Sequence, residues 1–345
     1  MAQLFNAHHE LFTRPADERF ETLADLARHC RDQKARSARI KRPSTEFRPV
    51  CHDGCLALQV NGFAPVRLNN WSLTQLCGLA GAAKETVNRL RPETACQVLT
   101  ETLCERVHDE VDFQTLTLDD TLVRAVNGDR YKRLWNADLL GLVEQVATDF
   151  TAPQRAAAGG TGLYAGEQDM FCFLIDPTGW TEIGGEAFAP GLFLWNSEVG
   201  KRTVGLSTFW FQAVCANHIV WDAVEIVEIT RRHTGDVRET FAELQAAIEA
   251  LVRRRDARKD GFAKVVAKAM GTIYGQDAEE TTALLTKAGF TKQLADKATA
   301  IARQQGSFTL WSVVDALTQL ARELPFASAR TELDQKASAL LALAA

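Results

Sequence analysis

GLFLWNSEVGKRTVGLSTFWFQAVCANHIVWDA, residues 191–223, is among the most apolar and aromatic stretches of the chain, and it decides the predicted fold class. Gly191–Val199 and Arg202–Val214 are rich in aromatic and β-branched residues, which favour strands. Gly200-Lys201 between them has the composition of a turn. Ile219–Thr230 predicts a third strand. We therefore expect an antiparallel sheet at the centre of the protein.

Two polar clusters interrupt this apolar stretch, Asn196-Ser197-Glu198 and Cys215-Ala216-Asn217-His218. Short polar side chains bind nearby backbone groups in turns, and Asn tolerates the left-handed region. A helix over 209–220 is the alternative for the second cluster, because Phe209, Gln212 and Ala216 have helical spacing. We prefer strands, with a structural motif at their bends composed of Asn196, Ser197, Glu198, Gly200, Cys215 and Asn217.

Earlier in the chain, turn dipeptides between apolar runs predict further hairpins. Asp53-Gly54 and Asn61-Gly62 divide Phe47–Leu68 into a three-stranded meander. Pro65 lacks a backbone N–H and places the third strand at an edge. Leu116–Val126 predicts a strand pair that is followed by a turn at Asn127-Gly128.

Helical spacing dominates elsewhere, over 72–107, from Asn136 to about Val146, and after Gly235. The fold class is therefore α+β, with a central, largely antiparallel sheet flanked by helices and an all-helical C-terminal third. We divide the chain into an N-terminal basic arm (1–45), an α+β core domain (46–235) and a helical C-terminal region (236–345). The last region is predicted to contain helices over 237–255, 261–273, 278–287, 294–304, 310–323 and 330–344.

Composition predicts a cytoplasmic protein. The chain has 345 residues, of which 46% are hydrophobic, and no apolar run approaches the roughly 20 residues that a membrane span needs. The first residues lack the apolar segment of a secretory signal. The eight cysteines form no dense framework of short loops, so we expect reduced thiols.

Charge is distributed unevenly around a net value of −5. The first basic island, Arg28–Arg42, has seven basic residues and one acid, and the second, Arg253–Lys268, has seven basic residues and two acids. An acidic stretch, Glu93–Asp120, has eight acids and one arginine. Local fields decide what a surface attracts, so the islands are candidate contacts for a polyanion.

Catalytic and metal motifs are weak. Cys215 and His218 suggest a thiolate–imidazole pair oriented by Glu198, but residues three apart face each other only in a helix. Cys51 and Cys55 lack the second half of a zinc motif. The glycine-rich segment 159–162 lacks the Gly-Lys ending of a phosphate loop. We expect no cofactor and no metal.

Six short strings of the sequence form a recognisable series along the chain: Trp71–Cys77, Asp129–Asn136, Gly162–Phe171, Phe193–Gly200, Val214–Trp221 and Thr309–Asp315. In these strings and in their order, the chain resembles the phage/plasmid-like proteins of the domain of unknown function 932 family. Many members have Gly where this chain has His218, which leaves His218 as a candidate contact residue. The resemblance implies a protein of mobile elements, whose genes often serve DNA replication, recombination or host conflict; it transfers no catalytic residue.

The leading functional hypothesis is a non-enzymatic protein that binds or anneals single-stranded DNA, with bases stacking on Tyr131, Trp135 or Trp210. The alternatives are a homo-oligomeric structural or partner-binding protein, such as a host-conflict factor, and a Cys/His enzyme. For both the nucleic-acid-binding and the partner-binding hypothesis we expect a homo-oligomer that does not contact a membrane. The predicted nucleic-acid contacts are Arg36, Arg39, Lys41, Arg42, Arg130, Tyr131, Lys132, Arg133, Lys201, Arg202, Arg253, Arg254 and Arg255.

Overall fold

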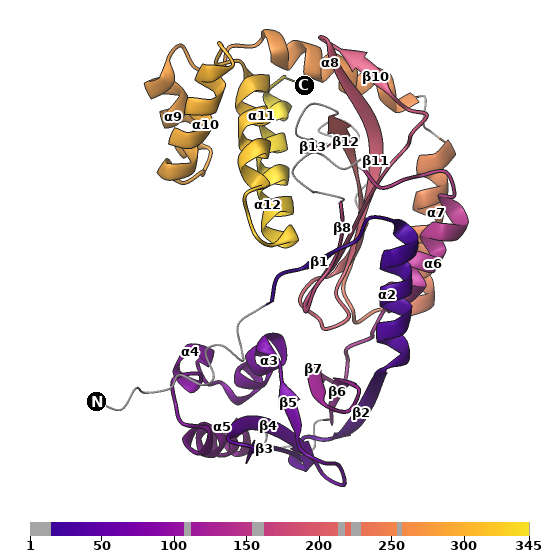
Figure 1. The fold of residues 1–345 in the computed structure, drawn as a ribbon, viewed down its shortest axis with the longest axis vertical. Coiled ribbons are helices and arrows are strands. Elements are labelled where there is room, and N and C mark those ends of the chain that lie inside the picture. Colours follow the sequence, from indigo (N-terminus) through magenta and orange to yellow (C-terminus); the bar gives the residue numbers. More distant parts are fainter. Residues whose placement is uncertain are drawn as a thin grey trace.

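A computed structural model describes residues 15–106, 112–153, 162–212, 218–221, 229–253 and 257–344, with the backbone alone described for 218–221 and 257–260. Two β-sheets lie in two lobes, one above the other in Figure 1. The small lobe comprises residues 37–128 with sheet B, and the large lobe contains sheet A and the remaining helices.

Sheet B has six strands in the order β2-β6-β7-β5-β4-β3, antiparallel except for the pair β5–β7. Its apolar face packs on three helices through Leu58, Leu73 and Leu99, all nearly inaccessible to solvent. The strands are β2 (Ser37–Pro43), β3 (Phe47–His52), β4 (Cys55–Val60), β5 (Val66–Leu68), β6 (Asp112–Leu118) and β7 (Leu122–Gly128). The helices are α3 (Asn70–Ala80), α4 (Lys84–Val87) and α5 (Pro92–Arg106).

The meander of β3, β4 and β5 is confirmed, but two predictions about sheet B are wrong. β5 lies between β4 and β7 and is not an edge strand. Pro65 is tolerated because β5 begins one residue later, at Val66, so the proline lies outside the ladder. The turn between β6 and β7 is Asp119-Asp120, with positive φ angles of 51° and 53°, and Asn127-Gly128 is the end of β7.

Sheet A has eight strands, with β1-β8-β9-β11-β12-β13 as its main order, and all its pairs are antiparallel. β11 and β12 are its longest strands and are almost completely buried, which explains their apolar sequence. The strands are β1 (Glu18–Arg19), β8 (Leu163–Ala165), β9 (Met170–Ile175), β10 (Thr181–Ile183), β11 (Glu186–Asn196), β12 (Val204–Gln212), β13 (His218–Trp221) and β14 (Ile229–Arg231).

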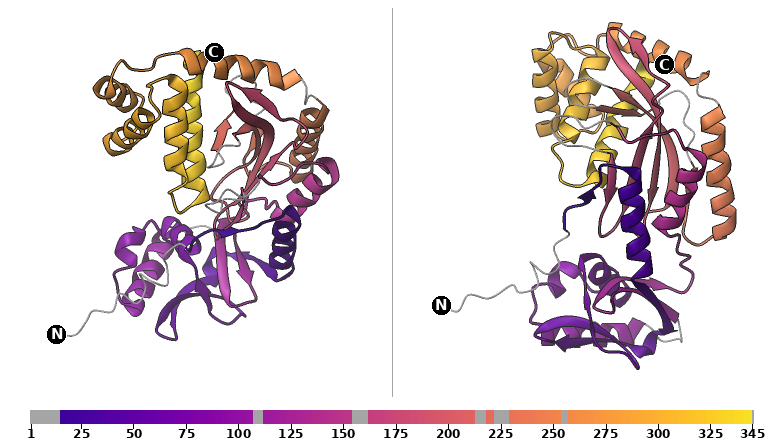
Figure 2. Two further views of the ribbon diagram at one scale, coloured as in Figure 1. Left: turned by 45° about the horizontal axis from the view of Figure 1, so that its top comes forward. Right: turned by 45° about the vertical axis from the view of Figure 1, so that its right-hand side comes forward.

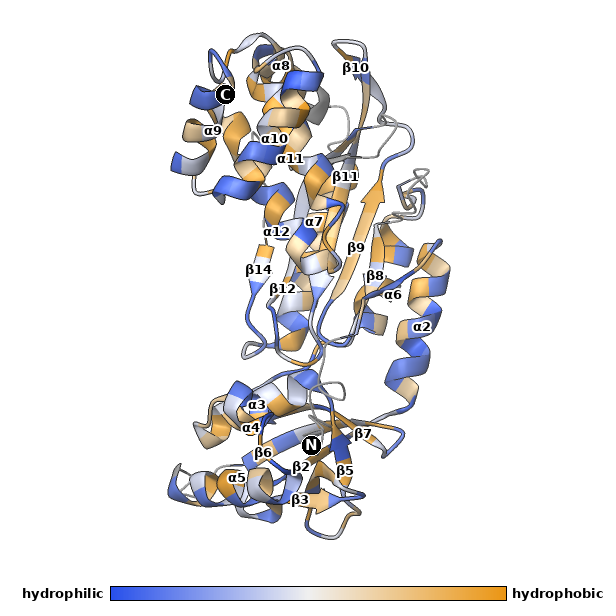
Figure 3. Ribbon diagram, turned by 60° about the vertical axis from the view of Figure 1, so that its left-hand side comes forward, coloured by the Kyte–Doolittle hydropathy of each residue, from blue (hydrophilic) through white to orange (hydrophobic). Residues whose placement is uncertain are grey.

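Helices cover sheet A, as the apolar residues of its strands require. Part of one face packs on α2 (Leu23–Ala35), α6 (Asn136–Val146) and α7 (Val237–Arg253). Farther along this face Phe188 and Trp210 meet α8 (Ala257–Gly271), where Trp210 stacks on Phe262 at 4.3 Å between ring centroids. Figure 3 shows β9 as mainly hydrophobic, whereas hydrophilic residues recur along α2.

The C-terminal third is helical, as predicted, and the α+β class is confirmed. After α8 come α9 (Ala278–Lys287), α10 (Lys292–Gln304), α11 (Leu310–Ala321) and α12 (Ala327–Ser338). The side chains of Asp277, Thr291 and Thr309 accept hydrogen bonds from backbone N–H groups in the first turns of α9, α10 and α11, which explains where these helices begin. None of the described helices is long and apolar enough to cross a membrane.

The small lobe is inserted into the large lobe. α2 packs on α6 in the large lobe, and the chain then passes directly into β2 of sheet B. It returns after β7 through residues 129–135, the connector, as Figure 2 shows from two further sides. The division predicted at residue 45 therefore falls inside sheet B, between β2 and β3. The described part of the predicted basic arm forms α2 and an edge strand of that sheet.

Trp210→Ala is expected to lower the free energy of unfolding by about 3–5 kcal/mol, because it leaves a cavity between sheet A and α8. Trp180→Ala, at a tryptophan that is 37% exposed, should cost about 1 kcal/mol or less. Urea unfolding followed by circular dichroism measures both. Equal losses for the two variants would contradict the burial of Trp210, which also makes this residue unsuitable for stacking on bases.

Candidate functional site

The tip of the β11–β12 hairpin, residues 196–203, lies at the junction between the lobes. Asn196, Ser197, Glu198 and Val199 are at most 2% exposed, although three of them are polar. Buried polar groups must find partners, and these residues find them on both lobes. The polar cluster of the opening stretch is therefore the place where sheet A meets the small lobe.

Val199 is held through its backbone carbonyl, which accepts three hydrogen bonds from the small lobe. Trp71 Nε1 and Gln75 Nε2 of α3 donate at 2.9 and 2.8 Å, and Asn127 Nδ2 of β7 donates at 3.3 Å. Gln75 also accepts a bond of 2.9 Å from the N–H of Val126. Its side chain thus joins the hairpin tip to β7, at a position that follows the two residues of β7 paired with β5.

Glu198 forms a buried ion pair with Arg124 of β7, with 3.0 Å between Oε2 and Nη1 and side chains that are 1% and 5% exposed. Its other carboxylate oxygen accepts a 2.8 Å bond from the N–H of Asn136, at the start of α6. Arg133 Nη1 donates to the Glu198 carbonyl at 2.6 Å. Burial lowers the pKa of Arg133 to about 10, so this guanidinium still carries its charge at neutral pH.

A β-bulge in β7 presents Arg124 to the junction. Leu116 pairs with Ala125 and Thr117 pairs with Val123, so Arg124 is the additional residue on β7. A bulge redirects a side chain relative to strict alternation along the strand. No sequence signal for this bulge was recognised, and Arg124 was absent from the predicted residues.

The other predicted motif residues also serve the junction. Asn196 Nδ2 donates to the carbonyl of Leu134 at 2.9 Å and to Asn136 Oδ1 at 2.8 Å. Ser197 Oγ accepts a 2.9 Å bond from the N–H of Lys201, which fixes the turn. Gly200 has φ 83°, and a Cβ there would lie 3.0 Å from Asn127 Nδ2. Any side chain at this position would therefore be strained and crowded.

The residues of the proposed catalytic pair are not brought together by anything described. Cys215 and Asn217 lie outside the described residues, and of His218 only the backbone is described, opposite Gln212. The carboxylate of Glu198 already binds Arg124 and the N–H of Asn136. Within the described ranges no group of three or more His, Cys, Asp or Glu side chains is arranged to hold a metal.

The first basic island is largely neutralised by acids distant in sequence. Because β2 pairs with β6, Arg36 reaches Asp119 and Lys41 reaches Asp112 at 3.1 Å, and both acids belong to the acidic stretch. Arg42 lies 3.8 Å from Glu46. Exposed pairs of this kind contribute little to stability, but they reduce the charge available to a ligand.

Near the junction, Arg39, Arg130 and Lys132 are exposed and have neither an acid within 4 Å nor a ring contact among the described residues, and we call them the seam cations. Arg39 lies on β2, close enough to Arg133 to contribute to the lowered pKa of that residue. The connector carrying Arg130 and Lys132 is tied to sheet B by Gln114, whose side-chain amide donates to the carbonyls of Gly128 and Tyr131 at 2.9 Å each.

Trp135 ends the connector, is half-buried, and is contacted by two other cations. Lys34 Nζ lies 5.7 Å from its ring centroid and the Arg133 guanidinium carbon lies 5.8 Å away. Lys34 also pairs with Asp138 at 2.5 Å. Two cations therefore contact the ring, one of them neutralised by Asp138 and the other largely buried.

The remaining predicted contacts are engaged within the protein or lie elsewhere. Tyr131 donates to the Ser197 carbonyl at 2.8 Å and stacks on His233, and Arg133 is only 6% exposed. Arg202 binds Glu332 at 2.6 Å and Asp169 at 3.4 Å, while Lys201 lies 4.9 Å from the Trp71 ring. Arg253 lies 3.6 Å from Glu249 on α7. Arg254 and Arg255 lie outside the described residues.

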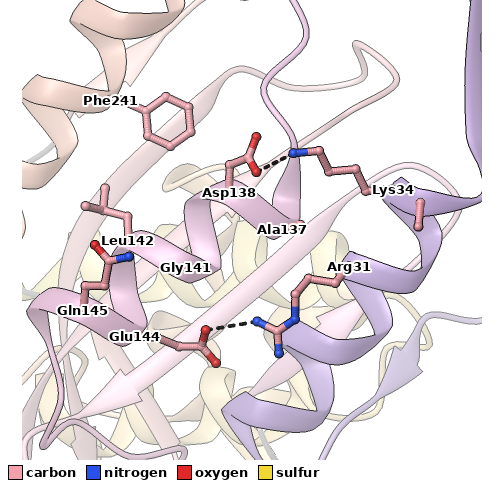
Figure 4. A pocket seen from close by; sticks show the side chains of 10 residues that line it. Arg31, Lys34, Ala137, Asp138, Gly141, Leu142, Glu144, Gln145 and Phe241 are labelled. Atoms are coloured by element: carbon pink, nitrogen blue, oxygen red, sulfur yellow. Dashed lines mark hydrogen bonds and ion pairs between the residues drawn. The ribbon is translucent and has the colours of Figure 1, made fainter.

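A groove of about 940 Å³ lies over α6, between α2 and α7. Figure 4 shows Leu142 and Phe241 along it and two ion pairs across its α2 side, Lys34–Asp138 and Arg31–Glu144, the latter at 3.2 Å. These charges satisfy each other, so the groove offers no free group for catalysis. Lys34 places one end of it next to Trp135.

Glu198 and Arg124 can be tested as a pair. Arg124→Met should lower the free energy of unfolding by about 3–5 kcal/mol, because the buried carboxylate loses its counter-charge. Adding Glu198→Gln should recover part of this loss, since the amide oxygen still accepts from Asn136 without a charge. Arg48→Met, on the opposite edge strand, serves as the exposed control. A double variant no more stable than Arg124→Met would contradict the pairing.

His233 makes the junction sensitive to pH. It is 5% exposed, and its Nδ1–H donates to the Lys132 carbonyl at 3.1 Å, since a carbonyl can only accept. Burial lowers the pKa of His233, and the charge of Arg133 acts in the same direction. The folded state therefore binds the proton less readily than the unfolded state, whose histidine titrates near pH ~6.5.

Stability should accordingly fall as the pH decreases below about 6.5, and His233→Phe should flatten this dependence. His52→Phe, at an exposed histidine, should leave the slope unchanged. Urea midpoints between pH 5 and 8 measure the effect. The same slope in wild type and His233→Phe would exclude His233 as its source.

Comparison with protein-family models, with curated proteins and with solved structures yields no match for this chain, so its resemblance to the domain of unknown function 932 family rests on the short motifs alone.

Proposed function

We propose that the protein binds single-stranded nucleic acid along the seam between its lobes. The observation that supports this proposal is that exposed cations about 90 positions apart in the sequence, Arg39 on β2 and Arg130 and Lys132 on the connector, lie on two elements that both flank the junction. Free guanidinium and ammonium groups bind phosphates, and an adjacent aromatic ring is the usual platform for an unpaired base.

The neutralised cations help to limit where such a ligand would bind. Arg36 is paired with Asp119 and Lys41 with Asp112, so little net charge remains near the two ends of β2. The seam cations have no comparable partner among the described residues. With a net charge of −5 over the whole chain, binding should be weak and strongly dependent on salt.

A role in recombination or replication of a mobile element is a further part of the proposal, and it depends on the motif resemblance alone. Binding at the seam does not require that role. The alternative of a partner-binding oligomer makes a different prediction for the same sample, since its oligomeric state would be indifferent to nucleic acid.

The triple variant Arg39→Gln, Arg130→Gln, Lys132→Gln tests the site. Three phosphate contacts predict that the logarithm of the binding constant for single-stranded DNA falls with the logarithm of salt with a slope of roughly −2, and the variant should lose most of this slope. Fluorescence anisotropy with a labelled oligonucleotide, titrated at several salt concentrations, measures it.

Arg48→Gln, Arg89→Gln, Arg91→Gln removes the same charge from exposed positions away from the seam and should bind as the wild type does. Equal losses in both triple variants would reduce the effect to net charge and exclude a specific site. No binding at low salt would exclude the function itself. Light scattering with and without the oligonucleotide then tests the alternative.

A further inference from the structure

The small lobe contains a cluster of three thiols that the proposed function does not use. Cys51 lies on β3 and is exposed, Cys55 lies on β4 and is half-buried, and Cys96 lies on α5 and is 9% exposed. All seven cysteines of the described residues carry free thiols. The question is which of these thiols can react with one another.

Cys51 faces α5. It is opposite Leu56, whose side chain belongs to the core between sheet B and the helices, so the two residues share the face of the sheet that α5 covers. The Cys51 thiol lies 3.7 Å from Glu93 Oε1. Glu93 and Cys96 are three positions apart on α5 and therefore neighbours on its surface.

The contact of Cys51 with Glu93, one turn from Cys96 on the face of α5 that covers β3, brings the two thiols to the same part of the interface. Burial raises the pKa of Cys96 to about 11. Cys55 occupies the neighbouring position to Leu56 on β4, and alternation along a strand directs its side chain to the opposite face.

We propose that Cys51 and Cys96 form a reversible disulfide that links β3 to α5, with a low-molecular-weight organic disulfide such as glutathione disulfide as the oxidant. This inference is independent of nucleic-acid binding. The exposed thiol of Cys51 reacts first, because glutathione disulfide is too large to reach the buried thiol of Cys96.

The reaction proceeds by two exchanges. The Cys51 thiolate attacks one sulfur of glutathione disulfide, forming a mixed disulfide and releasing one glutathione thiolate, which takes up a proton. Cys96 then loses its proton and attacks the Cys51 sulfur, forming the protein disulfide and expelling the second glutathione. Two protein thiols are oxidised, and one external disulfide is reduced to two thiols.

Glu93 controls the rate of this chemistry. Burial and the neighbouring carboxylate raise the pKa of Cys51, and only the thiolate is nucleophilic. The bond should therefore form slowly at neutral pH and faster at alkaline pH. Once formed, it closes a loop of roughly 45 residues and should raise the thermal midpoint of the small lobe by roughly 5 °C or more.

The test is incubation of the full chain with glutathione disulfide, followed by proteolysis and mass spectrometry. We expect a linked pair of peptides containing Cys51 and Cys96, which dithiothreitol separates. Cys96→Ser should retain glutathione on Cys51, and Cys51→Ser should leave Cys96 unmodified. Cys104→Ser, at an exposed cysteine near the other end of α5, should behave as the wild type.

The variant Glu93→Gln distinguishes a disulfide formed in the folded protein from one formed when the two cysteines meet during unfolding. In the folded protein Glu93 lies beside Cys51, so removal of its carboxylate should accelerate the first exchange several-fold. The proposal is overturned if wild type keeps glutathione on Cys51, links Cys51 to Cys55, or remains unmodified. An unchanged rate in Glu93→Gln overturns the assigned role of Glu93.

Discussion

The arrangement of the two lobes depends on one buried carboxylate. Glu198 comes from the hairpin of the large lobe, and its counter-charge, Arg124, comes from a strand of the small lobe. A shifted arrangement of the lobes that kept Glu198 buried would leave its charge without a partner, which is costly inside a protein. Hydrogen bonds between uncharged groups also hold the lobes together, since the backbone carbonyl of Val199 accepts from the side chains of Trp71 and Gln75. Together with an apolar cluster in which Val199 meets Leu116 and Ala125 of sheet B, the junction thus specifies one relative position for the two sheets.

Much of the fold could be predicted from the sequence because its signals are local. Helical spacing alone located most ends of the C-terminal helices to within a few residues, and the structure shows Thr291 and Thr309 as caps of two of them. Strand order is not local. The rule that proline marks an edge failed at Pro65, since the residue lies just outside a three-residue strand in the interior of sheet B. The Asp119-Asp120 turn was missed because aspartate signals a left-handed turn less strongly than Asn-Gly does.

The charge pairing around the candidate site also depends on strand order, which the sequence did not reveal. Counting charges along the chain separated a basic island from an acidic stretch, yet the pairing of β2 with β6 brings Arg36 to Asp119 and Lys41 to Asp112. A ladder between distant segments thereby cancels charges that appeared independent. The sequence did identify Glu198 and Gly200 as structurally constrained. It did not identify Arg124, because no residue pattern indicated the bulge in the β6–β7 hairpin that directs this arginine inward.

The junction also determines which basic residues remain exposed. Along the connector, Tyr131 and Arg133 point inward, where they bind the carbonyls of Ser197 and Glu198. Arg130 and Lys132 of the same segment are exposed, as is Arg39 on β2. The exposed cations are therefore held in place by the same bonds that hold the lobes together. A ligand that spans β2 and the connector would contact both sides of this junction, so its affinity should depend on the integrity of the buried network as well as on the surface charges.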